Sequence, residues 1–96
     1  MAHRLAPEAE TDLDEVWFHI ASNGSVETAD RFVDSLTDRF FLLSAHPFAG
    51  RRRDDLLPDI RLFPVGDYVV LYFVEGPDVR ITRVVHGSRD LEALFE

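Results

Sequence analysis

The stretch from Tyr68 to Val74 most constrains the fold of this chain, because every residue in it is apolar or aromatic. A strand with one face open to water alternates apolar and polar residues, so an uninterrupted run predicts a strand that is covered on both faces. Turn residues bound the run at Pro64-Val65-Gly66-Asp67 and at Glu75-Gly76-Pro77-Asp78. We therefore expect a meander of three strands over residues 60–90, with this run as its central strand.

Two amphipathic helices are predicted before the meander, after a short extended segment at residues 2–5. The first begins at Pro7 and ends at Asn23-Gly24. The second is capped by Ser25 and ends at His46-Pro47. Apolar residues recur at helical spacing in both segments and predict one buried stripe on each helix. The stripes are Ala9, Leu13, Val16, Trp17 and Ile20 in the first helix, and Ala29, Phe32, Val33, Leu36, Phe40 and Leu43 in the second.

The order of these elements predicts an α+β fold of the type β-α-α-β-β-β. A helical hairpin packs on one face of a small, mainly antiparallel sheet, and Leu91, Leu94 and Phe95 form a short C-terminal helix or tail. The hairpin covers only one face of the central strand. We therefore expect a segment of a partner protein to cover the other face, with the tail covering part of it.

Length, composition and charge narrow the class of protein. The 96 residues predict a single domain over 1–96, and the absence of cysteine excludes disulfides and thiolate metal sites. No apolar run is long enough for a membrane helix, and the first residues do not read as a signal peptide, so we expect no membrane association and a cytoplasmic protein. The net charge of −8 opposes a phosphate backbone, so we expect no direct DNA binding by this chain alone.

Several short motifs, in this order along the chain, resemble the ParE branch of the RelE/ParE toxin superfamily, the toxins of bacterial type II toxin–antitoxin modules. The segment Arg83–Asp90 resembles the closing motif of that family and is the most specific of them. The others are Ala6-Pro7-Glu8-Ala9 with Asp12-Leu13 and Trp17, Ala29-Asp30-Arg31-Phe32, His46-Pro47, Gly50-Arg51, Arg61-Leu62-Phe63-Pro64-Val65 and Tyr68-Val69-Val70-Leu71-Tyr72.

The resemblance implies a toxin that a cognate, ParD-like antitoxin holds inactive by wrapping its C-terminal segment over the toxin surface. ParE toxins are associated with poisoning DNA gyrase, and RelE toxins cut mRNA in the ribosome. We expect a non-enzymatic toxin of the first type, without cofactors, with gyrase as the leading target. Two alternatives stay open: a ribosome-dependent endoribonuclease of the RelE type, and a non-toxic homologue that only binds an antitoxin.

The predicted target-binding residues lie on or just after the meander strands: Arg61, Arg83, His86, Arg89 and Asp90. In the ribonuclease reading, His86 is the general acid or base while Arg61 and Arg83 stabilise charge on the phosphate. The RelE pattern, however, uses a cluster of basic residues with a C-terminal Tyr, and no Tyr follows Tyr72 here. We therefore predict no catalytic residue. A purely structural reading pairs these Arg and His side chains with Asp90 or with terminal carbonyl groups.

The predicted antitoxin contacts are Trp17, Phe18, Tyr68, Val70 and Tyr72. Trp17 and Phe18 are adjacent in the first helix and point to different sides, so we expect one in the core and the other at the interface. The alternative is that both aromatic side chains pack at the edge between the helical hairpin and the sheet.

Two further sets of polar residues are not expected to form binding sites. The run Arg51-Arg52-Arg53 stands next to Asp54-Asp55, which favours a solvated loop that satisfies its own charges over a docking patch for nucleic acid or an acidic partner. His3, His19 and His46 show no metal-ligand spacing, so we predict no metal site.

Overall fold

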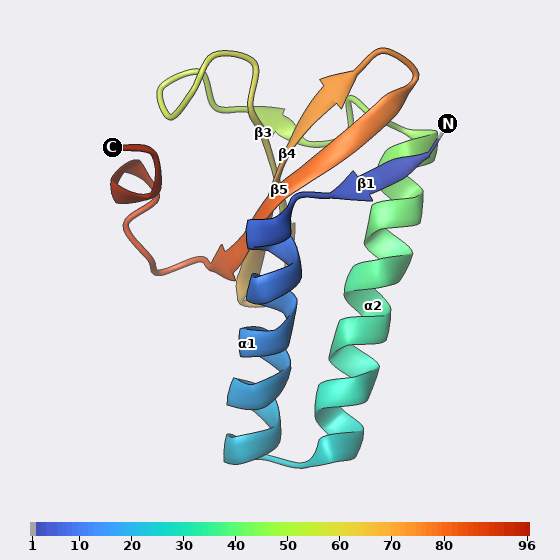
Figure 1. The fold of residues 1–96 in the computed structure, drawn as a ribbon, viewed down its shortest axis with the longest axis vertical. Coiled ribbons are helices and arrows are strands. Elements are labelled where there is room, and N and C mark those ends of the chain that lie inside the picture. The colour runs from blue at the N-terminus through green and yellow to red at the C-terminus, as the bar shows by residue number, and fades with distance from the viewer. Residues whose placement is uncertain (1) are drawn as a thin grey trace.

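The run of apolar residues forms β4 (Tyr68–Glu75), the middle strand of a five-stranded sheet with the order β1-β5-β4-β3-β2 in a computed structural model that describes residues 2–96. The remaining elements are β1 (His3–Leu5), α1 (Pro7–Asn23), α2 (Val26–Ala45), β2 (Arg51–Arg52), β3 (Arg61–Val65), β5 (Asp78–His86) and the short 3₁₀ helix η1 (Glu92–Phe95) (Figure 1). The predicted α+β fold is confirmed, with the two-residue β2 as an addition.

The sheet is mainly antiparallel, as predicted. β3, β4 and β5 form two successive hairpins, and β1 joins the edge of β5 in parallel. Gly66 and Gly76 have φ angles of 58° and 62° in the two hairpin turns, a left-handed conformation that glycine adopts without steric cost. Pro64 was expected in a turn but lies within β3. It is tolerated there because β2 pairs only with Arg61 and Leu62, so no neighbouring strand needs an N–H from Pro64.

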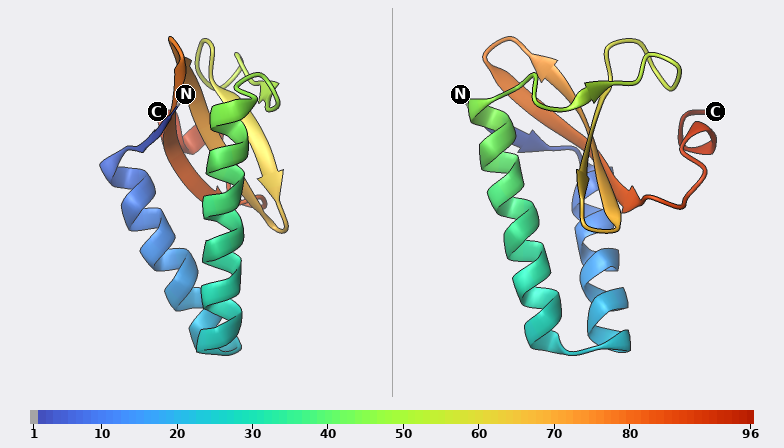
Figure 2. Two further views of the ribbon diagram at one scale, coloured as in Figure 1. Left: turned by 90° about the vertical axis from the view of Figure 1, so that its right-hand side faces the viewer. Right: turned by 180° about the vertical axis from the view of Figure 1, so that it is seen from behind.

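Both helices begin and end where the sequence predicts. Ser25 Oγ accepts a hydrogen bond of 3.1 Å from the Thr28 N–H at the start of α2. The two helices run side by side along one face of the sheet, extend beyond its end and join at a short turn (Figures 1 and 2). Most residues of the two predicted stripes pack on one side of the sheet: Ala9, Leu13, Val16, Ile20, Phe32, Leu36, Phe40 and Leu43.

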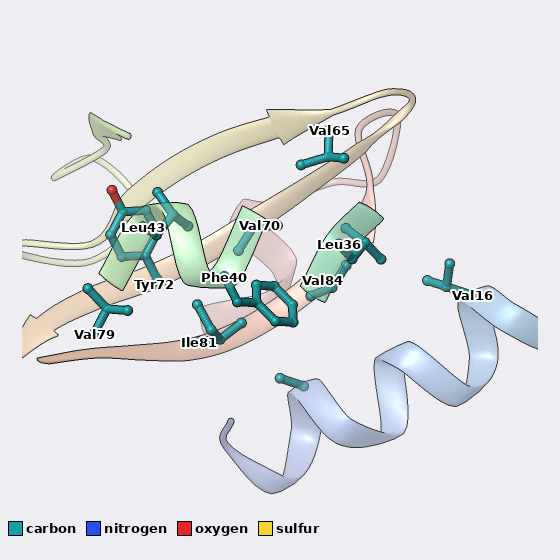
Figure 3. Packing of buried hydrophobic residues seen from close by; sticks show 11 residues of the cluster. Val16, Leu36, Phe40, Leu43, Val65, Val70, Tyr72, Val79, Ile81 and Val84 are labelled. Atoms are coloured by element: carbon teal, nitrogen blue, oxygen red, sulfur yellow. The ribbon is translucent and has the colours of Figure 1, made fainter. Parts of the chain in front are cut away.

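The main core lies between the helices and this face of the sheet. Figure 3 shows Val16, Leu36 and Phe40 pointing toward the strands. The buried members of this core are Ala9, Val16, Leu36, Phe40, Leu43, Val65, Val70, Tyr72, Val79, Ile81 and Val84.

The opposite face of the sheet is covered by the chain itself, which corrects the expectation that a partner segment covers most of it. Leu56 and Ile60, from the loop between β2 and β3, pack on this face and are buried. Leu91, Leu94 and Phe95 add partial cover from the C-terminal segment. The sheet residues beneath them are Leu62, Val69, Leu71 and Val85. The sequence-based prediction counted the tail but missed the loop, because an irregular, charged segment gives no periodic signal.

Candidate functional site

A cleft of about 270 Å³ lies between α1 and the end of the sheet where β4 begins and β5 ends. Its walls combine apolar strand residues with polar side chains of α1 and of the segment after β5. The lining residues are Asp12, Glu15, Val16, His19, Tyr68, Val84, Val85, His86 and Arg89. An adjoining hollow of about 360 Å³ shares His19, Tyr68 and His86 and continues along the hairpin to Phe32 and Thr28. Together the two hollows bring Tyr68, His86 and Arg89 of the predicted site residues to one concave surface.

Tyr68 and His86 form the wall that the two hollows share. They are opposite each other across β4 and β5, and their ring centroids are 5.3 Å apart at 74°. Phe32 also packs against Tyr68, with 5.3 Å between the ring centroids. Burial raises the pKa of the Tyr68 hydroxyl, and the nearby Asp67 carboxylate raises it further. Tyr68 therefore stays neutral at physiological pH and serves as a hydrogen-bonding aromatic surface.

The imidazole of His86 is oriented by Ser88. The Ser88 N–H donates a hydrogen bond of 3.1 Å to His86 Nδ1, and Ser88 Oγ lies 2.7 Å from the same nitrogen. Because a backbone N–H can only donate, Nδ1 acts as an acceptor and the neutral ring carries its proton on Nε2. His86 is exposed, so Nε2 is available to a partner.

Asp12 is the best-connected polar residue at the cleft, although it is only 4% exposed. Its carboxylate accepts hydrogen bonds from Arg83 Nε at 2.7 Å and Nη2 at 3.0 Å, and from the Val84 N–H at 2.9 Å. β1 ends its pairing at Ile81, so beyond that point α1 replaces it along the edge of β5, and Asp12 satisfies the edge N–H. Asp12 therefore fixes the position of α1 against β5.

This pairing removes Arg83 from the predicted target-binding surface. The hydrogen bond to Asp12 raises the pKa of the Arg83 guanidinium, although burial opposes the rise. Because Arg83 already donates two hydrogen bonds to one carboxylate, few of its guanidinium N–H groups are left for a phosphate or for a carboxylate of a partner. The sequence-based reading that Arg83 pairs structurally was correct in kind, but its partner is Asp12 and not Asp90.

Arg61 lies at the other end of the sheet. It stands opposite Tyr72 on β4, four residues along the strand from Tyr68, which corresponds to about 13 Å. Arg61 Nη1 donates to the Gly50 carbonyl at 2.7 Å, and the guanidinium lies 5.0 Å from the centroid of the Phe48 ring. The predicted grouping of Arg61 with His86 is therefore wrong, because strand spacing cannot be read from the order of motifs.

Arg89 and Asp90 follow β5 and are both exposed. Arg89 lines the cleft and has no salt bridge among residues 2–96. Asp90 Oδ1 accepts a hydrogen bond of 3.2 Å from the Glu92 N–H, in the turn that leads into η1. Of the five predicted target-binding residues, the structure brings only His86 and Arg89 together at an accessible surface of the cleft.

The residues predicted to contact an antitoxin divide into accessible and buried ones. Phe18 is 69% exposed, while Trp17 and Tyr68 are partly buried. Val70 and Tyr72 are 0% exposed, so in this structure neither side chain offers a surface to a partner, which corrects their assignment. They face the helices, and the Tyr72 hydroxyl donates to the Pro47 carbonyl and accepts from the Gly50 N–H, both at 2.8 Å. Burial raises the pKa of that hydroxyl.

Two residues of the basic run Arg51-Arg52-Arg53 form ion pairs within their own loop. Arg52 pairs with Asp54 and Asp59, at 3.1 and 3.0 Å, and Arg53 makes two hydrogen bonds of 2.9 Å with Asp55. The prediction of a self-satisfied loop is confirmed for these two arginines. Arg51 remains exposed.

Two residues of the helical hairpin, the buried Asp12 and the exposed Phe41, were not predicted from the sequence. Asp12 was not predicted to form an ion pair, although it occupies the buried side of α1 between Ala9 and Val16, and an acid within an apolar stripe indicates a buried ion pair. Phe41 was not noticed, because an exposed aromatic at a polar position of a helix carries no periodic signal.

The cleft can bind a partner side chain or a small polar group, but it lacks a preformed cation clamp. The exposed groups able to transfer protons are His86, His19 and Glu15, and Arg89 is the one arginine among the lining residues. No set of three potential metal ligands occurs among the described residues. No helix within residues 2–96 is long and apolar enough to cross a membrane.

Comparison with known proteins assigns the sequence. Residues 4–91 match the profile of a family described as the ParE toxin of the type II toxin–antitoxin system, parDE. Toxin ParE3 of Caulobacter vibrioides is 39% identical over 82 residues, which are 85% of this chain and 82% of the relative. Toxin ParE1 of the same organism is 32% identical over 91 residues, 95% of this chain and 94% of the relative.

Two solved structures share the fold. One is a chromosomal ParDE toxin–antitoxin system from P. aeruginosa, with a TM-score of 0.78, 22% identity, and coverage of 90% of this chain and 95% of the matched chain. The other is the toxin–antitoxin complex RelBE2 from Mycobacterium tuberculosis, with a TM-score of 0.67, 24% identity, and coverage of 88% and 95%.

Proposed function

This chain belongs to the ParE toxin family of type II toxin–antitoxin systems, and from that premise we propose that it inhibits growth by binding a protein target, DNA gyrase, and is neutralised by a cognate ParD-like antitoxin. The proposal makes the chain a cytoplasmic binding protein and not an enzyme. His86 and Arg89 at the cleft are its target contacts. Trp17, Phe18 and Tyr68 are its antitoxin contacts.

The observation that supports a non-enzymatic function is that the two arginines a ribonuclease would need are already hydrogen-bonded within the fold and lie far apart. Arg83 is held by Asp12, and Arg61 is held by the Gly50 carbonyl at the other end of the sheet. Phosphoryl chemistry requires preorganised cations around one reacting phosphate. Arg89 alone does not meet that requirement. Binding, in contrast, needs only an accessible surface with complementary groups.

The test is induction of this chain alone in a bacterial host that carries a DNA-damage reporter and a translation reporter. Arrest with the DNA-damage signal rising first is the expected result. The variant His86→Ala with Arg89→Ala is expected to relieve the arrest without loss of folded protein, as measured by circular dichroism. Arrest in which translation collapses first would overturn the gyrase assignment.

A ribosome-dependent endoribonuclease is the second candidate. The observation in its favour is that His86, Tyr68 and Arg89 line one cleft, so that a proton-transfer group and a cation are adjacent. This reading predicts that ribosomes programmed with mRNA show cleavage with the purified chain and none with His86→Ala. A third reading, a non-toxic antitoxin-binding homologue, predicts a tight complex and no arrest by soluble, folded protein.

A further inference from the structure

The side of the helical hairpin that faces away from the sheet carries two largely exposed aromatic side chains. Phe18 on α1 is 69% exposed, and Phe41 on α2 is 63% exposed although its ring contacts the His3 ring of β1, with 4.9 Å between the centroids. The tip of the hairpin also extends beyond the strands (Figure 1). Large exposed aromatics are enriched where proteins bind one another.

Helical spacing gathers these aromatics with carboxylates. Asp14 and Phe18 are four residues apart on α1, and Asp30 and Asp34 are four apart on α2, so each pair shares one side of its helix. Phe41 follows Asp34 by two turns. The two helices are linked across this side by a hydrogen bond of 2.8 Å from Trp17 Nε1 to Asp30 Oδ1. We define the hairpin outer face as Asp14, Phe18, Asp30, Asp34 and Phe41.

The charge of the molecule is concentrated on this hairpin. Residues 7–45 contain nine acids and two arginines, which leaves −7 of the total net charge of −8. In the rest of the chain, which we call the sheet half, four acids are paired with arginines: Asp54, Asp55, Asp59 and Glu75. Among the described residues, the only salt bridge that involves the hairpin is Asp12 with Arg83. The hairpin therefore presents an uncompensated negative field around exposed aromatics.

We propose that the hairpin outer face binds a basic amphipathic segment of the cognate antitoxin, an inference that rests on the function proposed above. Basic side chains complement the field, and apolar side chains on the same segment cover Phe18 and Phe41. A second copy of this chain would bring two faces of like charge together, and nucleic acid or an anionic membrane would be repelled. A basic protein segment is the occupant that both the charge and the aromatics favour.

The test measures association of this chain with its antitoxin, separated from the co-expressed complex, at low and high sodium chloride concentration. Electrostatic steering raises association rates by about 10-fold or more and weakens as salt screens the charges. We expect the association rate to fall with salt. We expect Asp14→Arg with Asp34→Arg to lower it about tenfold at low salt and to flatten its salt dependence.

Two matched variants separate charge from packing. Glu92→Arg with Glu96→Arg makes the same change of net charge on the exposed C-terminal segment and is expected to stay within about twofold of the unmodified rate. Phe41→Ser is expected to speed dissociation and to leave the salt dependence unchanged. Equal effects of the two charge-reversal pairs, or association that does not depend on salt, would overturn the proposal.

Growth assays keep this proposal separate from the proposed function. The charge-reversed hairpin variant is expected to arrest growth and to resist rescue by the antitoxin. If it is rescued as well as the unmodified chain, the hairpin outer face is not the antitoxin surface. If the unmodified chain causes no arrest, growth inhibition is refuted, and the binding measurements still decide the surface.

Discussion

Asp12 shows how a single acidic residue can organise a helix-to-sheet contact. It satisfies a guanidinium and a strand-edge N–H at once, and it is nearly inaccessible to water. Removing one partner of such a pair leaves the other groups buried without compensation, which costs more than the pair itself contributes.

Asp12→Ala is therefore expected to lower the free energy of unfolding by about 3 kcal/mol, less than a fully buried pair because Arg83 keeps some contact with water. Urea denaturation followed by circular dichroism measures the change. Asp14→Ala on the exposed side of the same helix is the control, with an expected change within about 0.5 kcal/mol. Equal losses for both would show that Asp12 acts only through the charge of the helix.

Gly50 is required by a close approach and not by its backbone angles. A Cβ at this position would lie 2.6 Å from Tyr72 Cε1 and from the Tyr72 hydroxyl oxygen, and 3.0 Å from the Leu62 carbonyl oxygen. The same tyrosine is fully buried and hydrogen-bonded to the loop on both of its hydroxyl functions. It cannot move aside without losing these bonds.

We expect Gly50→Ala to cost about 1–3 kcal/mol, the usual range for overpacking a closed site. Thermal denaturation checks it, and Tyr72→Phe provides the comparison, because it removes the hydroxyl and its two bonds without adding volume. The double variant is expected to lose less than the sum of the single losses, since the residues are in contact. Strict additivity would contradict a direct clash.

At the scale of elements, η1 helps to cover the second face of the sheet, and we expect this cover to contribute to the stability of the fold. The segment is short and only partly buried, but Leu91, Leu94 and Phe95 are the only C-terminal side chains packed against the second core among the described residues. The rest of that cover is the loop between β2 and β3, which its own ion pairs hold together.

Truncation after Asp90 is expected to lower the free energy of unfolding by about 2–4 kcal/mol, because the burial of three half-buried apolar side chains against the sheet is lost. It should also increase binding of an environment-sensitive hydrophobic dye to the native protein. Removal of Glu96 alone, the control, is expected to change neither quantity. A truncated chain of unchanged stability would mean that η1 is a passive appendage.

At the scale of the whole molecule, charge is divided between an uncompensated hairpin and a sheet half that pairs its own ions. Three acids of the sheet half have lowered pKa values. The Asp54 carboxylate accepts from the Asp59 N–H and from Arg52, Asp55 pairs with Arg53, and Asp78 accepts from the Ala2 N–H. In each case the fold favours the ionised form.

This arrangement predicts a loss of stability in acid. A carboxylate whose folded pKa is depressed contributes stability that is complete above its unfolded pKa, near 3.8, and is lost as the pH falls through the folded pKa. The free energy of unfolding, measured by urea titration at a series of pH values, is therefore expected to fall below about pH 4. Asp54→Asn with Asp55→Asn should weaken that dependence, and stability that rises on acidification would contradict it.

The periodic part of the fold was readable from residue order alone. Three features belong to this part: the uninterrupted apolar run of β4, the turn glycines and the two apolar stripes. They depend on local backbone geometry and on whether each side chain favours water or an apolar environment, and both follow from the sequence. They gave the element order, the hairpin and the mainly antiparallel sheet, and the ordered motifs gave the family.

Tertiary structure alone decided which polar residues meet. The distance between Arg61 and His86, the pairing of Asp12 with Arg83 and the burial of Val70 and Tyr72 depend on strand register and on which segment covers which face. Those contacts join residues up to 72 positions apart, as in Asp12 and Val84, and no local pattern encodes them. The chain's own loop covers the second face of the sheet. The surfaces that remain accessible to partners are therefore the cleft and the hairpin outer face.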